Sequence, residues 1–297
     1  MTNPNYPIYI PSKGRFDSML TSKSLTRMKV PHNIVVEPQE YEAYKQGVEK
    51  FDLGEYATVL QLPFSNLGLG SYPARNWAWD HSKENGHLKH WCVDDNITDF
   101  YRLNRNERIR VESGVVFKCA EDFVDRFENV PVSGFNYRFF VSPRSKYPPY
   151  YLNTKVYSCI LIQNDCEQRW RLKYNEDVDL CLQVLKAGLC TIQFNAFLSG
   201  KAATQTVSGG NTQELYGKQG NVKDPTGTLE KSKMLVEHHT DVASLVWRYG
   251  RVHHFVDYRP FKKNQLILKK DFVMPEGENQ YGMKLVKNFT VAKKQQS

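Results

Sequence analysis

Several features that would decide the class of a protein at once are missing from this sequence of 297 residues. No window holds about eighteen consecutive apolar residues, so we expect no transmembrane helix and no membrane partner. The first residues, MTNPNYPIYIPSKGR, lack the basic-then-apolar order of a signal peptide. The six cysteines show no CxxC spacing and lie inside apolar segments. We therefore predict reduced core thiols in a cytoplasmic protein rather than a disulfide framework or a zinc site.

What the sequence contains is the composition of an ordinary folded protein. Apolar residues make up 40% and charged residues 24%, and aromatic residues are frequent at 13%. The length suffices for one large domain or two modest ones with a substantial core. Forty lysines and arginines against 32 aspartates and glutamates leave a net charge of +8. This charge suits a polyanionic partner without requiring one.

Short apolar runs alternate with amphipathic stretches in the N-terminal third, which is the pattern of βαβ units on a parallel sheet. The apolar runs predict strands at 6–10, 33–36, 57–62 and 90–93. The stretches between them predict helices near 18–28, 38–45 and 72–85, the last ended by Gly86. We therefore expect an α/β fold with a mainly parallel sheet.

The pattern changes after residue 99. It predicts hairpin-like pieces at 114–117, 131–135 and 154–162, then a helix at 176–187 and a strand at 191–194. Residues 201–227 are rich in Gly, Thr, Asn and Gln and predict a long functional loop. A long helix over 227–249 and a lysine-rich arm from 261 follow. We expect residues 1–200 to form the core and residues 201–297 to form a helical and loop elaboration of the same compact domain.

The most informative string is HWCVDDNITDF, in which an apolar run ends in Asp94, Asp95 and Asn96. A strand followed by two acids predicts carboxylates at the C-terminal edge of the sheet, where open α/β sheets bind ligands. Paired carboxylates beside an amide oxygen form a hard-oxygen site for Mg²⁺ or Mn²⁺, which could bridge to a diphosphate. The alternative is a strand-end turn in which these side chains cap the local backbone.

Two loops with cations and glycines precede this string. In SNLGLGSYPARN, Gly68 and Gly70 permit close backbone approach and Arg75 falls in the first turn of a helix, as phosphate recognition requires. The loop after the first strand could border a nucleotide through Pro11, Ser12, Lys13, Gly14 and Arg15. The alternatives are an arginine that pairs with a neighbouring acid and a solvated N-terminal turn.

Acidic residues also open the helix predicted at 176–187. Its apolar positions 178, 181, 182 and 185 have helical spacing, so Glu176, Asp177 and Asp179 crowd the first turn. They either cap the helix or provide a general base at the mouth of a cleft. The histidines come in adjacent pairs, 238–239 and 253–254, and at most one member of a pair would face a given site.

Together and in this order, these elements resemble a GT-A glycosyltransferase. SNLGLGSYPARNWAWDHSKENGHLKHWCVDDNI resembles the glycine–ARN helix and the strand-end DxD-type motif of that superfamily, with Asp-Asp-Asn in place of a strict DxD. NEDVDLCLQVLKAG resembles its later ED-containing helix, where inverting members keep their catalytic base. AATQTVSGGNTQELYG and WRYGRVHHFVDYRPF are similar to the phage-type, TET/JBP-associated glycosyltransferases, which are inferred or known to place sugars on hydroxymethylated pyrimidines in DNA.

The resemblance implies a Rossmann-like GT-A core, a UDP-sugar donor and a divalent cation, Mn²⁺ or Mg²⁺. The nucleotide would be bordered by Pro11, Ser12, Lys13, Arg15, Arg75 and Asp94. The metal would be held by Asp94, Asp95 and Asn96, with His254 as a late ligand. Asp177, with Glu176 beside it, would be the general base of an inverting transfer, and the helix dipole would lower the pKa of Asp177.

The activity implied is transfer of a sugar to 5-hydroxymethylcytosine in double-stranded DNA by a monomer, in the host cytoplasm if the protein is phage-encoded. An aromatic side chain could stack on an extruded base. Phosphates would be contacted by cations of the flap and C-terminal segment, namely Lys201, Arg248, Arg251, Arg259, Lys262 and Lys263. Two alternatives remain: a transferase acting on a glycan, lipid or protein, and a catalytically silent nucleic-acid-binding module.

Overall fold

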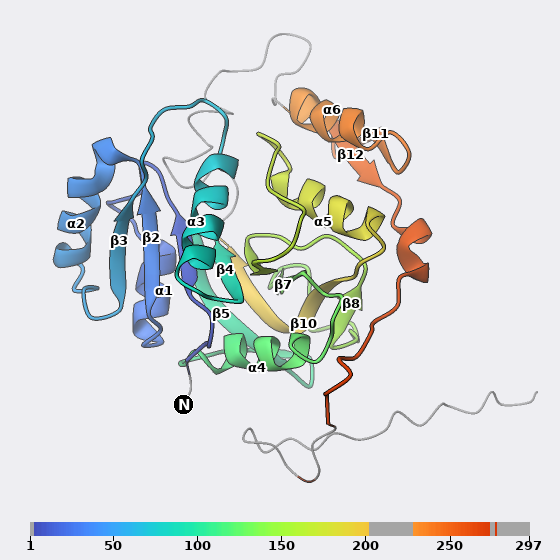
Figure 1. The fold of residues 1–297 in the computed structure, drawn as a ribbon, viewed down its shortest axis with the longest axis horizontal. Helices are drawn as coiled ribbons and strands as arrows, with labels where there is room; N and C mark the ends of the chain where they lie inside the picture. The colour runs from blue at the N-terminus through green and yellow to red at the C-terminus, as the bar shows by residue number, and fades with distance from the viewer. Residues whose placement is uncertain (1–2, 202–227, 274–276, 278–297) are drawn as a thin grey trace, which may run out of the picture.

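The computed structural model describes residues 3–201, 228–273 and 277, and it begins with a series of βα units (Figure 1). The predicted strands and helices of this region are present, with ends that differ by a few residues. Gly86, the glycine expected to end the third helix, has the left-handed φ of 76° that a helix C-terminus favours. In chain order the elements are β1 (Ile8–Pro11), α1 (Leu20–Arg27), β2 (His32–Val36), η1 (Pro38–Glu40), α2 (Tyr41–Lys50), β3 (Ala57–Gln61), α3 (Tyr72–Glu84) and β4 (Lys89–Val93).

The rest of the described chain extends the sheet and adds an outer layer. Its first part comprises β5 (Ile97–Asn104), β6 (Glu107–Arg110), α4 (Val115–Val124), β7 (Val132–Tyr137), β8 (Tyr150–Leu152) and β9 (Cys159–Gln163). Its second part comprises α5 (Glu176–Lys186), β10 (Thr191–Lys201), α6 (Thr228–His238), β11 (Ala243–Arg248), β12 (Arg251–Val256) and η3 (Arg259–Lys263).

Ten strands form one sheet in the order β3-β2-β1-β4-β9-β7-β10-β5-β6, with β8 also paired to β10. The pairs β1–β2, β2–β3, β1–β4 and β7–β10 are parallel, and only β5, β8 and β9 among these strands run the other way. The predicted α/β fold with a mainly parallel, Rossmann-like sheet is therefore confirmed. Because β1, β4, β7 and β10 point the same way, their carboxyl ends meet at one edge of the sheet.

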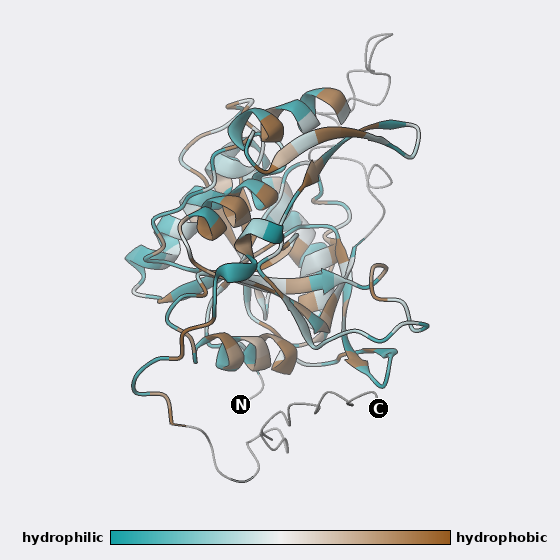
Figure 2. Ribbon diagram, turned by 90° about the vertical axis from the view of Figure 1, so that its right-hand side faces the viewer, coloured by the Kyte–Doolittle hydropathy of each residue, from teal (hydrophilic) through white to brown (hydrophobic). Residues whose placement is uncertain are grey.

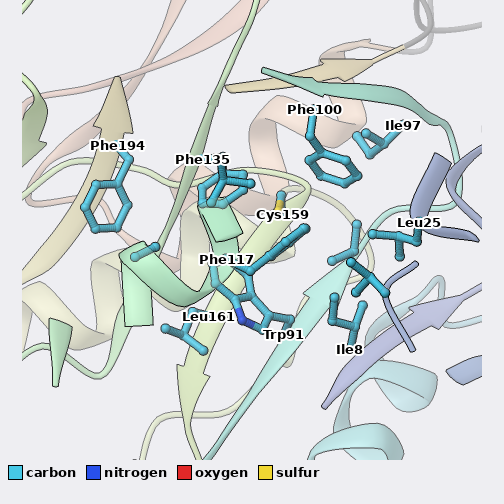
Figure 3. Packing of buried hydrophobic residues seen from close by; sticks show 14 of the residues in the cluster. Ile8, Leu25, Trp91, Ile97, Phe100, Phe117, Phe135, Cys159, Leu161 and Phe194 are labelled. Atoms are coloured by element: carbon cyan, nitrogen blue, oxygen red, sulfur yellow. The ribbon is translucent and has the colours of Figure 1, made fainter. Parts of the chain in front are cut away.

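Buried apolar side chains on both faces of the sheet hold the helices in place. On one face, Trp91 of β4 packs against Phe117 of α4 with ring centroids 5.0 Å apart, and Leu25 of α1 joins the same cluster (Figure 3). On the other face, Trp79 of α3 belongs to the cluster that also contains Cys92 of β4 and parts of α5. Successive residues of β4 thus point to opposite faces, and the sheet lies between two helical layers.

A further layer covers the outer side of α5. Leu235 of α6, Val242 and Phe261 pack against α5 residues that include Val178 and Leu182. The apolar stripe predicted for this helix is therefore buried, but it divides, because Cys181 faces the sheet while positions 178, 182 and 185 face the outer layer. Figure 2 shows apolar and hydrophilic residues alternating along the helices of these layers. The described part of the segment after β10 thus packs against α5, the helix whose first turn carries three acids.

Two predicted elements differ in the structure. Residues 114–117 begin helix α4 rather than a hairpin, because Val116, Phe117, Ala120 and Val124 recur at helical spacing and are all buried. The long helix predicted at 227–249 ends at His238, and residues 243–256 form the hairpin β11–β12 instead. Valines and aromatic residues dominate this hairpin, and a two-residue connection containing glycine separates its strands, which favours strand pairing over a helix.

Within the described ranges, no helix is both long enough and apolar enough to cross a bilayer. The loop predicted at 201–227 lies outside the described residues after its first position, as does most of the arm beyond residue 273.

Candidate functional site

A cavity of about 540 Å³ opens at the edge of the sheet where β1, β4, β7 and β10 end. Open α/β sheets bind ligands at this edge because the loops that follow parallel strands converge there. The cavity brings together every site residue predicted from the sequence: Pro11, Ser12, Lys13, Arg15, Arg75, Asp94, Asp95, Asn96, Glu176, Asp177 and His254.

Asp94, the first residue after β4, is the most heavily compensated acid of the site. Its Oδ1 accepts a hydrogen bond of 2.7 Å from Arg75 of α3. Its Oδ2 accepts from Ser158 at 2.5 Å and from Lys201 at 2.8 Å. Burial alone would raise the pKa of Asp94, but the charges of Lys201 and Arg75 outweigh it and hold this pKa well below the ordinary value.

Asp95 faces the loop that follows β1. Its carboxylate forms an ion pair with Arg15 and accepts a hydrogen bond of 2.7 Å from Ser12. The hydroxyl of Tyr44 completes this cluster, since it lies 2.6 Å from the Ser12 hydroxyl and accepts from the Arg15 amide. Burial raises the pKa of Asp95 in spite of these partners. The loop predicted to border a nucleotide is thus fastened to Asp95 of the acidic pair.

The oxygen donors at positions 94–96 have the chemistry that Mg²⁺ or Mn²⁺ prefers. Asn96 is buried, and its Oδ1 has no hydrogen-bond partner among the described residues, so it is an oxygen available to a cation. No group of three or more His, Cys, Asp and Glu side chains within the described ranges could hold a metal. These residues therefore fit the predicted cation only if Asn96 or a bound diphosphate supplies further oxygens.

His254, the predicted late metal ligand, lies on β12 and lines the same cavity as its neighbour His253, so the expectation that at most one member of this pair would face a given site is wrong. Burial, together with the charges of Lys231 and Lys155, lowers its pKa to about 4. The ring is therefore neutral near pH 7 and keeps a lone pair for a ligand. Its role as a metal ligand stays a prediction.

Glu176 and Asp177 are the first two residues of helix α5, and their side chains have different surroundings. Glu176 accepts a hydrogen bond of 2.8 Å from Ser71 and lies 3.5 Å from Arg75, so it ties α5 to the start of α3. Asp177 is only partly buried and lines the cavity. Burial and the neighbouring carboxylates of Glu176 and Asp94 raise the pKa of Asp177. The predicted lowering of this pKa is therefore wrong, because burial and the like charges of Glu176 and Asp94 outweigh the charge of Arg75.

Asp179, the third acid of this turn, points away from the cavity. Its fully buried carboxylate accepts from the Arg171 guanidinium at 2.9 Å and lies 2.7 Å from Nε2 of His239, which follows α6. The hydrogen bonds from these two partners help to lower its pKa against the effect of burial. Asp179 is thus a structural residue that fastens the outer layer to α5.

Lys201 occupies a place that the sequence analysis did not anticipate. As the last residue of β10, it donates to Asp94 and, at 2.8 Å, to the Ser158 hydroxyl inside the cavity. The contact of Lys201 with DNA phosphates stays a prediction. The missed signal was the length of β10, which continues past the predicted end at residue 194 through an irregularity between Phe194 and Leu198.

Aromatic residues that the sequence analysis also missed form one wall of the cavity. Tyr137, at the end of β7, is stacked between Phe139 and Tyr157, with ring centroids 5.3 and 5.6 Å away. Its hydroxyl lies 2.6 Å from that of Ser158. The end of a strand at the ligand-binding edge was the signal available for Tyr137.

One of the two glycines in the glycine-rich loop allows another segment of the protein backbone to approach closely. Gly70 has a φ of 79°, and a Cβ there would lie 2.7 Å from the carbonyl oxygen of Lys173. The close approach permitted by this glycine is therefore toward the segment that leads into α5. Gly68 has a left-handed φ of 67° and no atom within 4 Å of the position that a Cβ would take, and its approach to phosphate stays a prediction.

Comparison with known proteins adds a family to this geometry. The family model described as TET-Associated Glycosyltransferase matches residues 6–210, which span β1 to β10 and so contain most of the cavity. No curated protein matches the chain. A glycosyltransferase of this kind implies a nucleotide-sugar donor.

The ion pairs of Asp94 with Arg75 and Lys201 lead to a prediction about the stability of the protein. Asp94→Asn leaves Arg75 and Lys201 without their main counter-charge, so we expect it to lower the free energy of unfolding by about 3 kcal/mol at pH 7. Asp241→Asn removes an exposed ion pair with Lys186 and should cost far less.

Urea denaturation of both variants and the wild type over a pH series measures this difference. Because the pKa of folded Asp94 is lowered, its contribution is complete above the ordinary pKa of about 4 and is lost as the pH falls below it. The gap between the wild type and Asp94→Asn should therefore narrow in acid. Equal stabilities at pH 7 would contradict the prediction.

Proposed function

The chain belongs to the family of TET-associated glycosyltransferases, and on that premise we propose that it transfers a sugar from a UDP-sugar to 5-hydroxymethylcytosine in double-stranded DNA, as a monomer. The observation that carries the proposal is the cavity itself, in which strand-end acids, a cationic loop and the acidic start of α5 line one space. Seven lysines and arginines and five acids line it, so the site favours an anionic ligand.

The donor is proposed to bind between the loop after β1 and the start of α3. Pro11, Ser12 and Lys13 line the cavity on the first side, and Arg75 lines it on the second. An arginine with a planar fork of donors, fixed in place by Asp94, suits a phosphate group. Lys201 adds a second cation near the same carboxylate, and together they favour the diphosphate of UDP leaving with a negative charge.

A divalent cation is proposed to be held by Asp94, Asp95 and Asn96, with His254 as a further candidate ligand. When bound, it would neutralise charge on the leaving diphosphate. The orphaned amide oxygen of Asn96 supports this part of the proposal.

Asp177 is the proposed general base. It would accept the proton of the acceptor hydroxyl while that oxygen forms a bond to the anomeric carbon, and the bond from this carbon to the donor phosphate breaks with its electron pair leaving on UDP. The raised pKa suits the role, because a base with a pKa nearer to neutrality takes a proton more readily. Glu176 is held by Ser71 and Arg75, which favours a positioning role for it.

The DNA acceptor is supported by exposed cations on the hairpin β11–β12 and in η3. Arg248 and Arg251 lie on the hairpin β11–β12, and Arg259, Lys262 and Lys263 lie in η3, all of them exposed. Arg259 also pairs with Asp257 at 2.8 Å, so its charge is partly used within the protein.

Transfer to DNA is the direct test. Duplexes with cytosine or 5-hydroxymethylcytosine, incubated with a panel of UDP-sugars, should gain a hexose or pentose only on the hydroxymethylated base, as read from the masses of the released nucleosides. Binding to the duplex should weaken with salt, with a log–log slope near −0.9 for each phosphate neutralised.

The same assays separate the alternatives. Slow hydrolysis of a UDP-sugar without any transfer to DNA would point to a glycan, lipid or protein acceptor. DNA binding without hydrolysis would point to a binding module.

Asp177→Asn should lower the rate of transfer by a factor of about 10²–10⁴ while the affinity for UDP-sugar stays nearly unchanged. In the wild type, the rate should fall on acidification at a pH above the ordinary carboxyl value of about 4, because the base must be ionised and its pKa is raised. Rates measured from pH 4 to 9 check this, with Asp241→Asn as an exposed carboxylate control. A normal rate for Asp177→Asn with a collapsed rate for Glu176→Gln would assign the base to Glu176.

Metal dependence is tested by calorimetry of UDP binding with Mn²⁺ and with EDTA. We expect EDTA to weaken binding by the wild type, and Asp95→Ala to remove the effect of the metal because it removes a donor oxygen. An affinity that EDTA leaves unchanged would mean that Arg75 and Lys201 neutralise the diphosphate without a metal.

A further inference from the structure

The hairpin β11–β12 ends in an aromatic residue that the fold does not require. Tyr249 and Gly250 connect the strands, and both have left-handed φ values, 53° and 74°. Two-residue turns of this conformation favour Asn-Gly, because a bulky side chain is strained there. The Tyr249 side chain is also 90% exposed, with its ring packed edge-on against His253 at 6.0 Å. A strained and exposed aromatic residue at the tip of a hairpin points to a contact outside the described fold.

The surroundings of Tyr249 indicate the chemistry of that partner. Arg248 and Arg251 face each other across the strands directly behind the tip, and both are exposed. Trp247 is 71% exposed on the opposite face of the hairpin. Residues 243–256 contain no acid. Cations that can contact phosphates beside aromatic rings that can stack on bases are the features of a nucleic-acid-binding surface.

The hairpin also joins this surface to the catalytic cavity. Arg251, His253 and His254 of β12 line the cavity, and the turn formed by Tyr249 and Gly250 directly precedes Arg251, so the tip lies next to the cavity lining. Figure 2 shows the hairpin extending away from the body of the molecule. A two-stranded ribbon has dimensions that the major groove of DNA admits, and the 5-substituent of a pyrimidine lies in that groove.

The position of Asp177 makes opening of the duplex necessary. Its carboxylate lines a cavity of about 540 Å³, which can hold a nucleotide and a sugar but not a double helix. A base that remains stacked could not bring its hydroxymethyl group to this carboxylate. The acceptor base must therefore leave the stack, as in other enzymes that modify bases.

We propose that the β11–β12 hairpin enters the DNA duplex beside the acceptor base, that Tyr249 stacks in the space which this base leaves, and that Arg248 and Arg251 contact the flanking phosphates. This inference rests on the proposed DNA acceptor and adds to it the element that opens the duplex. Tyr249 is a positioning residue in this account, since it touches neither the donor nor the reacting hydroxyl.

The test is Tyr249→Asn, because asparagine suits the left-handed turn and should leave the melting temperature the same or higher. Rates of transfer are measured on a hydroxymethylated duplex and on the same strand alone. The ratio of duplex rate to single-strand rate should fall roughly 5- to 100-fold, the effect of losing one stacking contact. Leu88→Asn is the matched control, because Leu88 is an exposed apolar residue that precedes β4, at the end of this strand away from the cavity. This variant should keep the wild-type ratio of duplex rate to single-strand rate.

A second readout follows the duplex itself. With 2-aminopurine placed next to the acceptor base, binding of the wild type should increase its fluorescence as the stack opens, and Tyr249→Asn should reduce the increase. A variant that keeps the wild-type ratio, or that loses both rates equally, overturns the inference while the proposed function stands. A wild type that modifies no DNA, single- or double-stranded, overturns the proposed function and this inference with it.

Discussion

The pairing of the Asp94 carboxylate is the interaction on which the arrangement of the site depends. This one group joins the end of β4 to α3 through Arg75, to the residue before β9 through Ser158, and to the end of β10 through Lys201. A poorly solvated carboxylate without counter-charge would cost several kcal/mol. The chain segments that carry its partners must therefore meet at this point, and the two halves of the sheet are held in register around it.

The charged groups near each carboxylate also explain why the pKa values of two acids in this site shift in opposite directions. Asp94 has two cations and a hydroxyl, and its pKa falls, whereas Asp177 has two carboxylates near it and its pKa rises. Burial raises the pKa of both groups, so the opposite directions come from the charged partners that the fold places beside each of them. A strongly ionised anchor and a more basic acid thus share one cavity.

Much of this arrangement could be predicted from local sequence. The acidic pair after β4, Arg75 in the first turn of α3 and the acids of α5 were found because strand ends and helix starts have clear signatures. The end of β10 was not found, since the strand continues through an irregularity that interrupts its alternation. The pKa of Asp177 was predicted in the wrong direction, because the prediction considered the dipole of its helix and not the burial of the carboxylate or the charges of Glu176 and Asp94 beside it. The β11–β12 hairpin was missed because a helical pattern was extended across its turn.

The attachment of the outer layer has a consequence for how such a protein can diversify. Asp179 fastens it to α5 through His239, and apolar residues of α6 and η3 complete the joint. The hairpin projects from this joint, and its turn, between Arg248 and Arg251, bears no part of the Asp94 cluster. Substitutions confined to Tyr249 and Gly250, which do not line the cavity, can therefore change what the tip contacts while the charges at the sheet edge stay as they are, so the two parts of the fold can diverge in sequence independently.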